Sequence, residues 1–202
     1  MTAAPRLYAL CALADGCFPP AHREVETGRG LVGALLVQGA LAGRLELHRD
    51  RVRPTRHGPA HDPLLEAFLT RLCTSRRDRT PAGWARRLGP WALAAVRPGV
   101  APAGRPVPGD RLGMQPAEAL RRVRSALREP DAAAPTAVAV GALLAASGLH
   151  HLLLPGTTRA EAHRRTARAV GALGPAGVPA ARAAAAVSDS LEGSAAALAF
   201  PG

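Results

Sequence analysis

The chain has 202 residues, which suits one domain of ordinary size with a substantial hydrophobic core. Its 26 basic residues are all arginine, and with 15 acidic residues they give a formal net charge of +11. The absence of lysine excludes Schiff-base, P-loop and Ser-x-x-Lys chemistry, and the positive charge favours an anionic partner: lipid headgroups, nucleic acid or a phosphorylated ligand.

The segment GRGLVGALLVQGALAGRLELHRD, residues 28–50, contains glycines with the spacing of a nucleotide-binding turn. Gly28, Gly30 and Gly33 fit the pattern G-x-G-x-x-G, which binds a dinucleotide when it follows a buried parallel strand. Residues 19–27 contain proline and several charges, which argues against such a strand. We therefore interpret the glycines as the start of a helix and a close helix contact, and we expect them to bind no nucleotide.

A short hairpin is predicted at residues 44–53, with its turn near Arg49 and Asp50. Only Gly43 separates the apolar helix from the alternating residues of the first strand. A helix that runs straight into an antiparallel hairpin also occurs in winged-helix DNA-binding domains. A DNA-binding protein of that class is therefore the alternative interpretation.

Most of the remaining chain is predicted to be helical, because apolar residues recur at helical spacing behind local start signals. Pro179 opens the last of these helices, in which Gly193 is a candidate break. The other start signals are Asp62-Pro63, Thr80-Pro81, Pro116 and a capping box from Thr158 to Glu161.

The apolar stretch 132–158 lacks Asp, Glu and Arg, but it is rich in small residues and interrupted by prolines. We interpret it as a buried helix from Pro135 to about Leu149 rather than as a membrane span. His150 and His151 are then expected at a helix end near the surface, where a protonated side chain suits the helix dipole.

Together these elements predict a mainly α fold: a single compact helical domain over residues 1–202, with one or two short β-hairpins. The sequence shows no internal repeat and no linker long enough to divide the chain. A central parallel sheet of several strands would contradict this prediction.

Five segments of the sequence contain motifs that can be compared with those of known protein families. In chain order they are LVGALLVQGALAGRLEL (31–47), DPLLEAFLTRL (62–72), TPAGWARRL (80–88), VRPGV (96–100) and TAVAVGALLAASGLHHLLLP (136–155). Their sequence and order resemble the Golgi phosphoprotein 3 family, in which a helix ending A-L-x-G-R-L leads into a short strand. The resemblance covers most of residues 7–175.

Lys, Ile and Asn, which have A/T-rich codons, are all missing, and this indicates a bacterial member from a GC-rich genome such as that of an actinobacterium.

The resemblance implies a mostly helical, non-enzymatic, peripheral membrane protein that recognises phosphatidylinositol 4-phosphate, with no cofactor, metal or catalytic residue. In the family, a tryptophan and several arginines hold the headgroup. The family's arginine in the first signature helix falls at Val32 here, with Arg29 nearly one turn away. Arg23 is the notable residue where the family's tryptophan is expected, and the Trp84 helix supplies two further arginines. The headgroup-binding set implied by the resemblance is Arg23, Arg29, Arg86 and Arg87.

The interpretation that follows is a cytoplasmic protein on the inner face of the cell membrane, whose partner is an anionic, phosphoinositide-like lipid. Nucleic acid is not expected as a partner, and a homo-oligomer is compatible with the resemblance. The simpler alternative for Arg86 and Arg87 is a solvated helix face, and Trp84 is expected in the core. If the predicted arginines gather, the start of the signature helix and the Trp84 helix must approach one another on one face.

Overall fold

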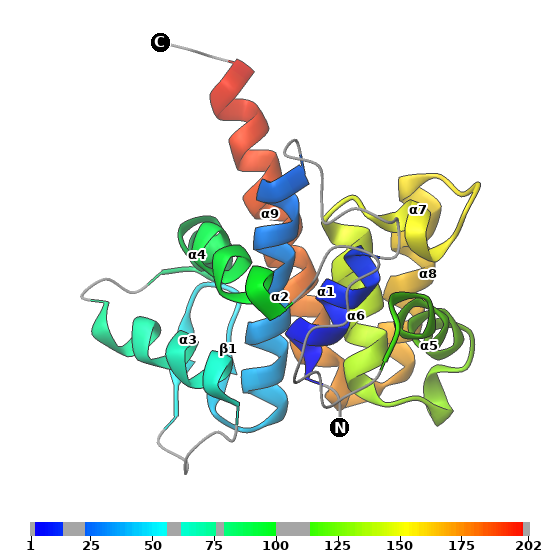
Figure 1. Ribbon diagram of the computed structural model, residues 1–202, viewed down its shortest axis with the longest axis horizontal. Coiled ribbons are helices and arrows are strands. Elements are labelled where there is room, and N and C mark those ends of the chain that lie inside the picture. The colour runs from blue at the N-terminus through cyan, green and yellow to red at the C-terminus, as the bar shows by residue number, and fades with distance from the viewer. Residues whose placement is uncertain (1–2, 14–22, 56–61, 76–78, 100–113, 200–202) are drawn as a thin grey trace.

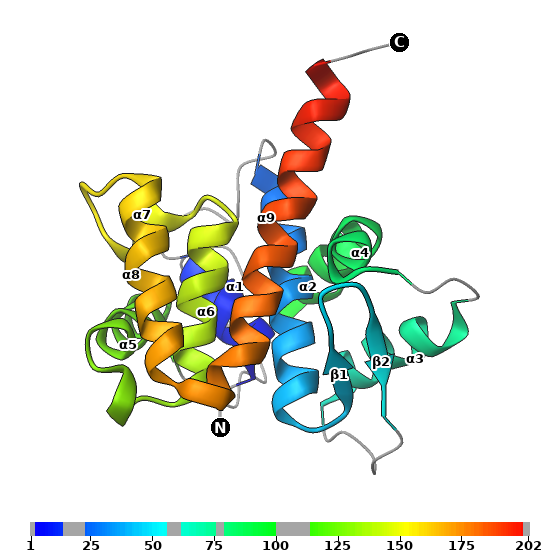
Figure 2. The same ribbon diagram turned by 180° about the vertical axis from the view of Figure 1, so that it is seen from behind.

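The computed structural model describes residues 3–13, 23–55, 62–75, 79–99 and 114–199. This part of the chain contains nine α-helices and one two-stranded antiparallel hairpin (Figure 1 and Figure 2), which confirms the predicted mainly α class. The helices are α1 (Ala4–Ala12), α2 (Glu24–Leu41), α3 (Pro63–Thr74), α4 (Pro81–Val96), α5 (Pro116–Arg128), α6 (Pro135–Ala146), α7 (His150–Leu153), α8 (Arg159–Ala172) and α9 (Val178–Ala199).

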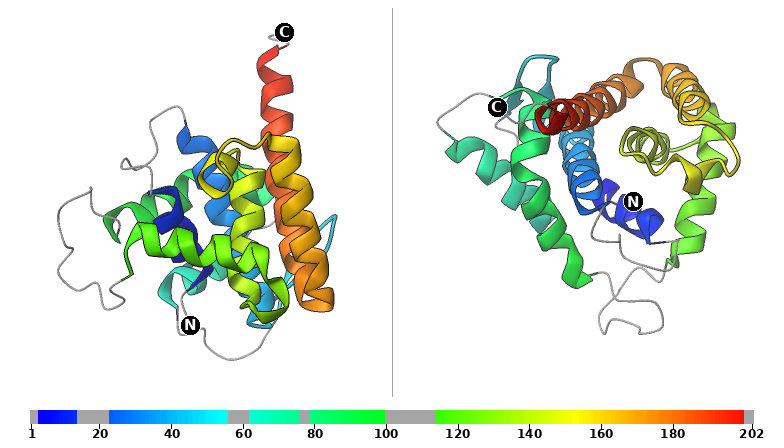
Figure 3. Two further views of the ribbon diagram at one scale, coloured as in Figure 1. Left: turned by 90° about the vertical axis from the view of Figure 1, so that its right-hand side faces the viewer. Right: turned by 90° about the horizontal axis from the view of Figure 1, so that it is seen from above.

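Two helices, α2 and α6, form the centre of the molecule. Residues 27–37 of α2 and residues 137–146 of α6 are buried throughout. A helix that is apolar all round must be covered all round. Accordingly, α1, α4 and α9 pack against α2, while α5, α8 and α9 pack against α6, as the view from above in Figure 3 shows. The buried side chains of these helices belong to one hydrophobic core.

The three glycines of the G-x-G-x-x-G pattern lie inside α2, and each faces a different neighbour. A Cβ atom added at Gly28 would lie 2.6 Å from the carbonyl oxygen of Gly89 in α4, and one at Gly30 would lie 2.0 Å from the Tyr8 hydroxyl oxygen in α1. At Gly33 the added atom would meet side chains of α6 and α9. The predicted close helix contact is confirmed. The predicted helix start is wrong, because α2 begins one turn earlier, in an acidic first turn that suits the positive end of the helix dipole.

Tyr8 also connects α1 to the C-terminal end of α6. Its hydroxyl lies 2.7 Å from the Ser147 hydroxyl, at the end of α6, and both side chains are buried. Burial is the main cause that raises the pKa of Tyr8 far above its usual range, although the bond to Ser147 opposes the shift. This contact joins residues 139 positions apart in the chain.

The predicted hairpin is confirmed at β1 (Leu45–Leu47) and β2 (Val52–Pro54). Leu47 pairs with Val52, and the side chains of Leu45, Leu47 and Val52 are buried. Gly43, with a φ of +67°, provides the left-handed residue that turns the chain from α2 toward β1. Figure 2 shows the hairpin beside α3.

The predicted start signals of α3 and α4 act as helix caps. The Asp62 carboxylate accepts hydrogen bonds from the Leu64 and Leu65 amides at 2.9 and 3.3 Å. The Thr80 hydroxyl accepts from the Gly83 amide at 3.0 Å. In both helices a proline follows the cap, where its missing N–H costs nothing.

At α8 only half of the predicted capping box forms. The Thr158 hydroxyl accepts from the Glu161 amide at 3.2 Å. The Glu161 carboxylate does not return to Thr158 but accepts from Arg164 and Arg165 at 2.6 and 2.7 Å. Bonds between two charged groups are stronger than a bond to a neutral amide, so the two arginines hold the carboxylate.

The end of the apolar helix differs from the prediction. Gly148 adopts a left-handed φ of +79°, and the Leu149 amide closes the helix end on the Leu144 carbonyl at 2.8 Å. α6 therefore ends at Ala146, and His150 begins the short helix α7 instead of marking the end of a helix.

The last helix, α9, is continuous for 22 residues and passes through Gly193, so the candidate break is wrong. A glycine inside a helix costs only about 1 kcal/mol relative to alanine, and the surrounding sequence is rich in alanine. The final turns project beyond the other helices (Figure 1 and Figure 3). Among the described helices, none has both the length and the apolar character that a bilayer crossing requires.

Candidate functional site

Three helices meet near the first turns of α2. α4 crosses α2 where Gly28 and Gly89 bring the two backbones into contact, and α9 packs against both helices (Figure 1). The start of α2 and the Trp84 helix therefore approach one another, as a shared arginine site requires. We call this meeting point the α2–α4–α9 junction; the residues that define it are Gly28, Arg29, Arg86, Gly89 and Ser190.

Arg29 lies inside the junction, with 9% of its surface exposed. Its guanidinium donates to the backbone carbonyl of Ser190 in α9 at 2.5 Å. Burial is the main cause that lowers the pKa of Arg29, and the positive charge of Arg86 lowers it further, while Glu26 opposes the shift. Because arginine stays protonated in proteins, the junction holds a buried positive charge beside a second, exposed one.

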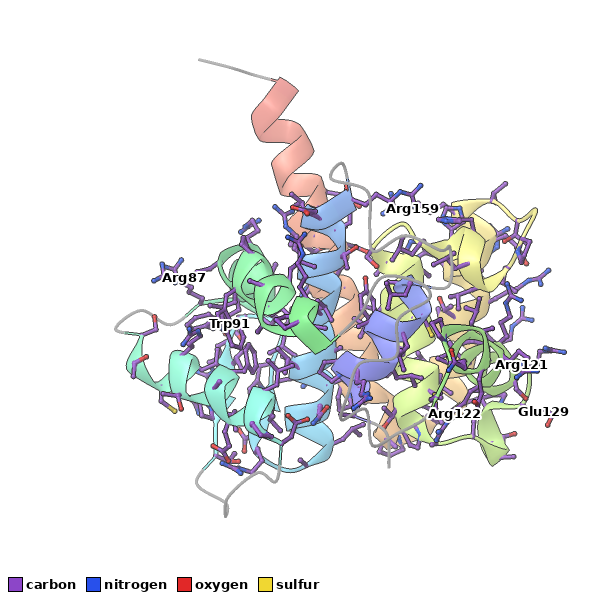
Figure 4. All side chains as sticks on the ribbon, viewed as in Figure 1. Arg87, Trp91, Arg121, Arg122, Glu129 and Arg159 are labelled. Carbon is purple, nitrogen blue, oxygen red and sulfur yellow. The ribbon has the colours of Figure 1, made fainter. Side chains whose placement is uncertain are left out.

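Arg86 and Arg87 are both exposed on α4, but their side chains point in different directions. Arg86 acts electrostatically on Arg29. Successive residues of a helix are rotated by about 100°, and Figure 4 shows Arg87 at the outer edge of α4, away from α2. The structure thus brings Arg29 and Arg86 together and leaves Arg87 on the outer surface.

Arg23, the fourth predicted residue, is half-buried at the N-cap of α2. Its charge acts on His150, so Arg23 lies toward α7. The next residue, Glu24, forms an ion pair with Arg97, just after the end of α4. The start of α2 therefore carries the positive charge of Arg23 on the side that faces α7. On the other side, the Glu24 carboxylate joins it to the end of α4 through Arg97.

Replacing Arg29 by alanine is expected to lower the free energy of unfolding by about 1.5–3 kcal/mol, because it removes a buried hydrogen bond from a charged group. Arg86→Ala should change that free energy by less than about 0.5 kcal/mol, because the side chain is exposed. Urea denaturation of both variants beside the unaltered protein measures the two values. Equal losses would show that the contact with Ser190 does not anchor Arg29.

The two tryptophans differ in environment. Trp84 is 3% exposed in the core, as expected. Trp91 is half-buried: it stacks on Phe68 with ring centroids 6.4 Å apart, and the guanidinium carbon of Arg71 lies 4.6 Å from its ring centre. Sequence reasoning missed this contact because Trp91 follows Trp84 by seven residues, a spacing that predicts one buried face for both.

Burial of α2 removes the structural basis of the DNA-binding alternative. A recognition helix must expose the residues that enter the major groove. In α2, however, residues 27–37 are buried on every side. The order of helix and hairpin is that of a winged helix, but the helix presents no face to DNA.

The junction offers the positive charge of two guanidinium groups. Guanidinium groups suit phosphate oxygens, because their N–H donors match the geometry of that anion. The amides of Gly28, Gly30 and Gly33 lie inside a helix, where each donates to the carbonyl four residues earlier and cannot hold a pyrophosphate. Within the described ranges, no group of three or more His, Cys, Asp or Glu residues is arranged to hold a metal ion.

Comparison with models of protein families matches residues 7–191 to Golgi phosphoprotein 3 (GPP34). The match begins within α1 and ends within α9, so it includes every residue of the junction. No curated protein and no solved structure matches the chain.

Proposed function

The chain belongs to the Golgi phosphoprotein 3 (GPP34) family, and from this premise we propose that it is a non-enzymatic, peripheral membrane protein that binds anionic lipid headgroups. The ligand that the family suggests is phosphatidylinositol 4-phosphate. The proposed location is the cytoplasmic side of the cell membrane, where anionic lipids attract basic surfaces.

The observation that carries the proposal is the pairing of Arg29 with Arg86 at the α2–α4–α9 junction. The two side chains come from different helices, and the charge of Arg86 disfavours the charged form of Arg29. An anionic headgroup beside them would offset this repulsion. The bond to Ser190 holds the buried guanidinium in position, while the Arg86 side chain is exposed, as contact with a headgroup would require.

The net charge of the chain supports the same conclusion. A formal charge of +11 draws the protein toward anionic surfaces, and each arginine near such a surface contributes about 1 kcal/mol of binding free energy. Several arginines acting together provide reversible attachment without a membrane-spanning segment.

Vesicle flotation, run beside a mobility shift with duplex DNA, tests the proposal. The protein should float with vesicles that contain phosphatidylglycerol or phosphatidylinositol 4-phosphate, and it should stay behind with neutral phosphatidylcholine. At matched total charge, stronger flotation with phosphatidylinositol 4-phosphate would establish headgroup recognition, whereas equal flotation would establish general anionic binding. A DNA shift at physiological salt without flotation would sink the proposal in favour of nucleic acid.

A further inference from the structure

Trp91 lies between α4 and α3, and the headgroup site proposed above does not use it. The guanidinium carbon of Arg71 lies 4.6 Å from the centre of the Trp91 ring, and Phe68 stacks on the same ring with centroids 6.4 Å apart. Phe68 is fully buried, Trp91 is half-buried and Arg71 is exposed. The indole ring therefore reaches from the core to the surface, and a positive charge lies beside it.

Two side chains of α3 fix the position of this ring. Phe68 and Arg71 are three residues apart, so they lie on the same side of α3. Aromatic stacking and cation–π contacts both stabilise a tryptophan beyond the burial of its surface area. A ring held in this way loses little conformational entropy when a further surface binds it. Trp91 is thus suited to act as an anchor.

The exposed side of α4 continues from the α2–α4–α9 junction to Trp91. Pro90 and Ala94 are both exposed. At about 100° per residue, they lie between Arg86 and Trp91 around the helix. Arg87 lies one turn before Trp91, and Figure 4 shows both on the side of the molecule formed by α3 and α4. We use the name Trp91 surface for the group Arg71, Arg87, Pro90, Trp91 and Ala94.

The charge of the Trp91 surface is positive. α4 contains no acidic residue, and the acidic residue of α3 is Glu66. The Glu66 carboxylate pairs with Arg44, just before β1, at 3.1 Å. Glu66 and Arg71 also lie about 140° apart around α3. Two arginines therefore stand beside apolar side chains on this surface, and no carboxylate lies among them.

We propose that the Trp91 surface lies in the headgroup region of an anionic bilayer, with Trp91 as the anchor between headgroups and acyl chains. Tryptophan favours this interface because its ring is apolar and its indole N–H is polar, and arginines beside it attract anionic lipid. The inference rests on the proposed function and adds the orientation of the protein to it. α4 lies along the membrane, with the junction at one edge of the contact and α3 at the other.

Fluorescence of single-tryptophan variants tests this contact. The chain has two tryptophans, so Trp84→Phe leaves Trp91 as the reporter, and Trp91→Phe leaves Trp84. On phosphatidylglycerol vesicles, the emission of Trp91 should shift to shorter wavelength. Its quenching by acrylamide should fall at least about twofold, because the bilayer shields the ring from water. Trp84, which is buried in the core, is the matched control and should change in neither respect.

Flotation of the same samples separates this inference from the proposed function. If the protein floats with the vesicles while the emission and quenching of Trp91 stay unchanged, the inference is overturned and the proposed function stands. If the protein does not float, the proposed function fails and the inference fails with it. Flotation together with a change at Trp91 alone supports both.

The Arg71→Gln variant measures the contribution of the cation that lies on the ring. One arginine near an anionic surface strengthens partitioning about fivefold, so Arg71→Gln should partition onto phosphatidylglycerol vesicles about fivefold less. Arg168→Gln is the matched control, because it removes the same charge from an exposed position of α8, across the molecule from α4 (Figure 2). Salt screens exposed charges that lie far from the contact, so the control should lose less than about twofold. Equal losses would count against the Trp91 surface.

Discussion

Arg86→Glu combined with Arg87→Glu is expected to lower partitioning onto anionic vesicles by about thirtyfold to a thousandfold. Each arginine near an anionic surface contributes about 1 kcal/mol. Reversing Arg86 therefore costs about 2 kcal/mol, and reversing Arg87 adds at most the same amount, because Arg87 points away from the junction. Flotation over a range of lipid concentrations, with phosphatidylglycerol as the anionic lipid, measures the partition coefficient of each form.

The matched control is Arg121→Glu combined with Arg122→Glu on α5, which changes the net charge by the same amount. Both residues are exposed, and Figure 4 places them on the opposite side of the molecule from Arg87. Because salt limits the reach of exposed charges to about 10 Å, the control should lose at least about tenfold less affinity. Equal losses from the two pairs would mean that only net charge matters.

Reversing the charge of one arginine at a time separates the contributions of Arg86 and Arg87 to vesicle affinity. Arg86 lies beside Arg29 at the junction, whereas Arg87 points outward from α4. Arg86→Glu should therefore account for the larger share of the lost affinity. A larger loss from Arg87→Glu would move the membrane-contacting surface to the outer side of α4, near Trp91.

Gly28→Ala is expected to destabilise the protein by about 3 kcal/mol or more, at the upper end of the range for overpacked positions. The added Cβ would lie 2.6 Å from the carbonyl oxygen and 2.9 Å from the carbonyl carbon of Gly89, so it meets backbone rather than a flexible side chain. Relief requires α4 to move away from α2, and with it the position of Arg86 relative to Arg29. Urea or thermal denaturation measures the loss.

Gly171→Ala on α8 is the matched control for this substitution. Both changes add one methyl group within a helix, but nothing lies within 4 Å of a Cβ atom at Gly171. Alanine favours the helix by up to about 1 kcal/mol relative to glycine, so this variant should be more stable than the unaltered protein. A Gly28→Ala protein as stable as Gly171→Ala would show that α2 and α4 are not in backbone contact.

Local sequence was sufficient to determine where most elements lie. Asp62 and Thr80 begin their helices because each side chain caps amides two or three residues away. The hairpin after Gly43 follows from alternation and a left-handed residue, which are also local properties. The burial of α2 on all sides follows from its apolar residues on every face. Prediction at this level succeeds because the interacting groups are neighbours in the chain.

Other residues were misjudged because a competing contact, local or distant, decided their role. The Glu161 carboxylate binds two arginines instead of its helix cap. His150 begins a helix because Gly148 ends the preceding one. The three glycines of α2 match a nucleotide-binding pattern, yet their spacing serves contacts with α4, α1 and the α6–α9 pair. In each case the sequence pattern is present, but the groups that its residues contact determine their structural role.

The arrangement of the candidate site depended on tertiary structure alone. Arg29 meets the carbonyl of Ser190 across 161 positions of sequence, and no periodicity connects the two. Arg86 and Arg87 are adjacent in the chain, but packing at Gly89 turns one toward Arg29 and leaves the other on the outer surface. Arg23, at the start of α2, acts electrostatically on His150 of α7, which lies 127 positions further along the chain. Helix periodicity determines which residues share a face, whereas the crossing of α2, α4 and α9 determines which faces meet, because only packed helices bring distant charges within range of one another.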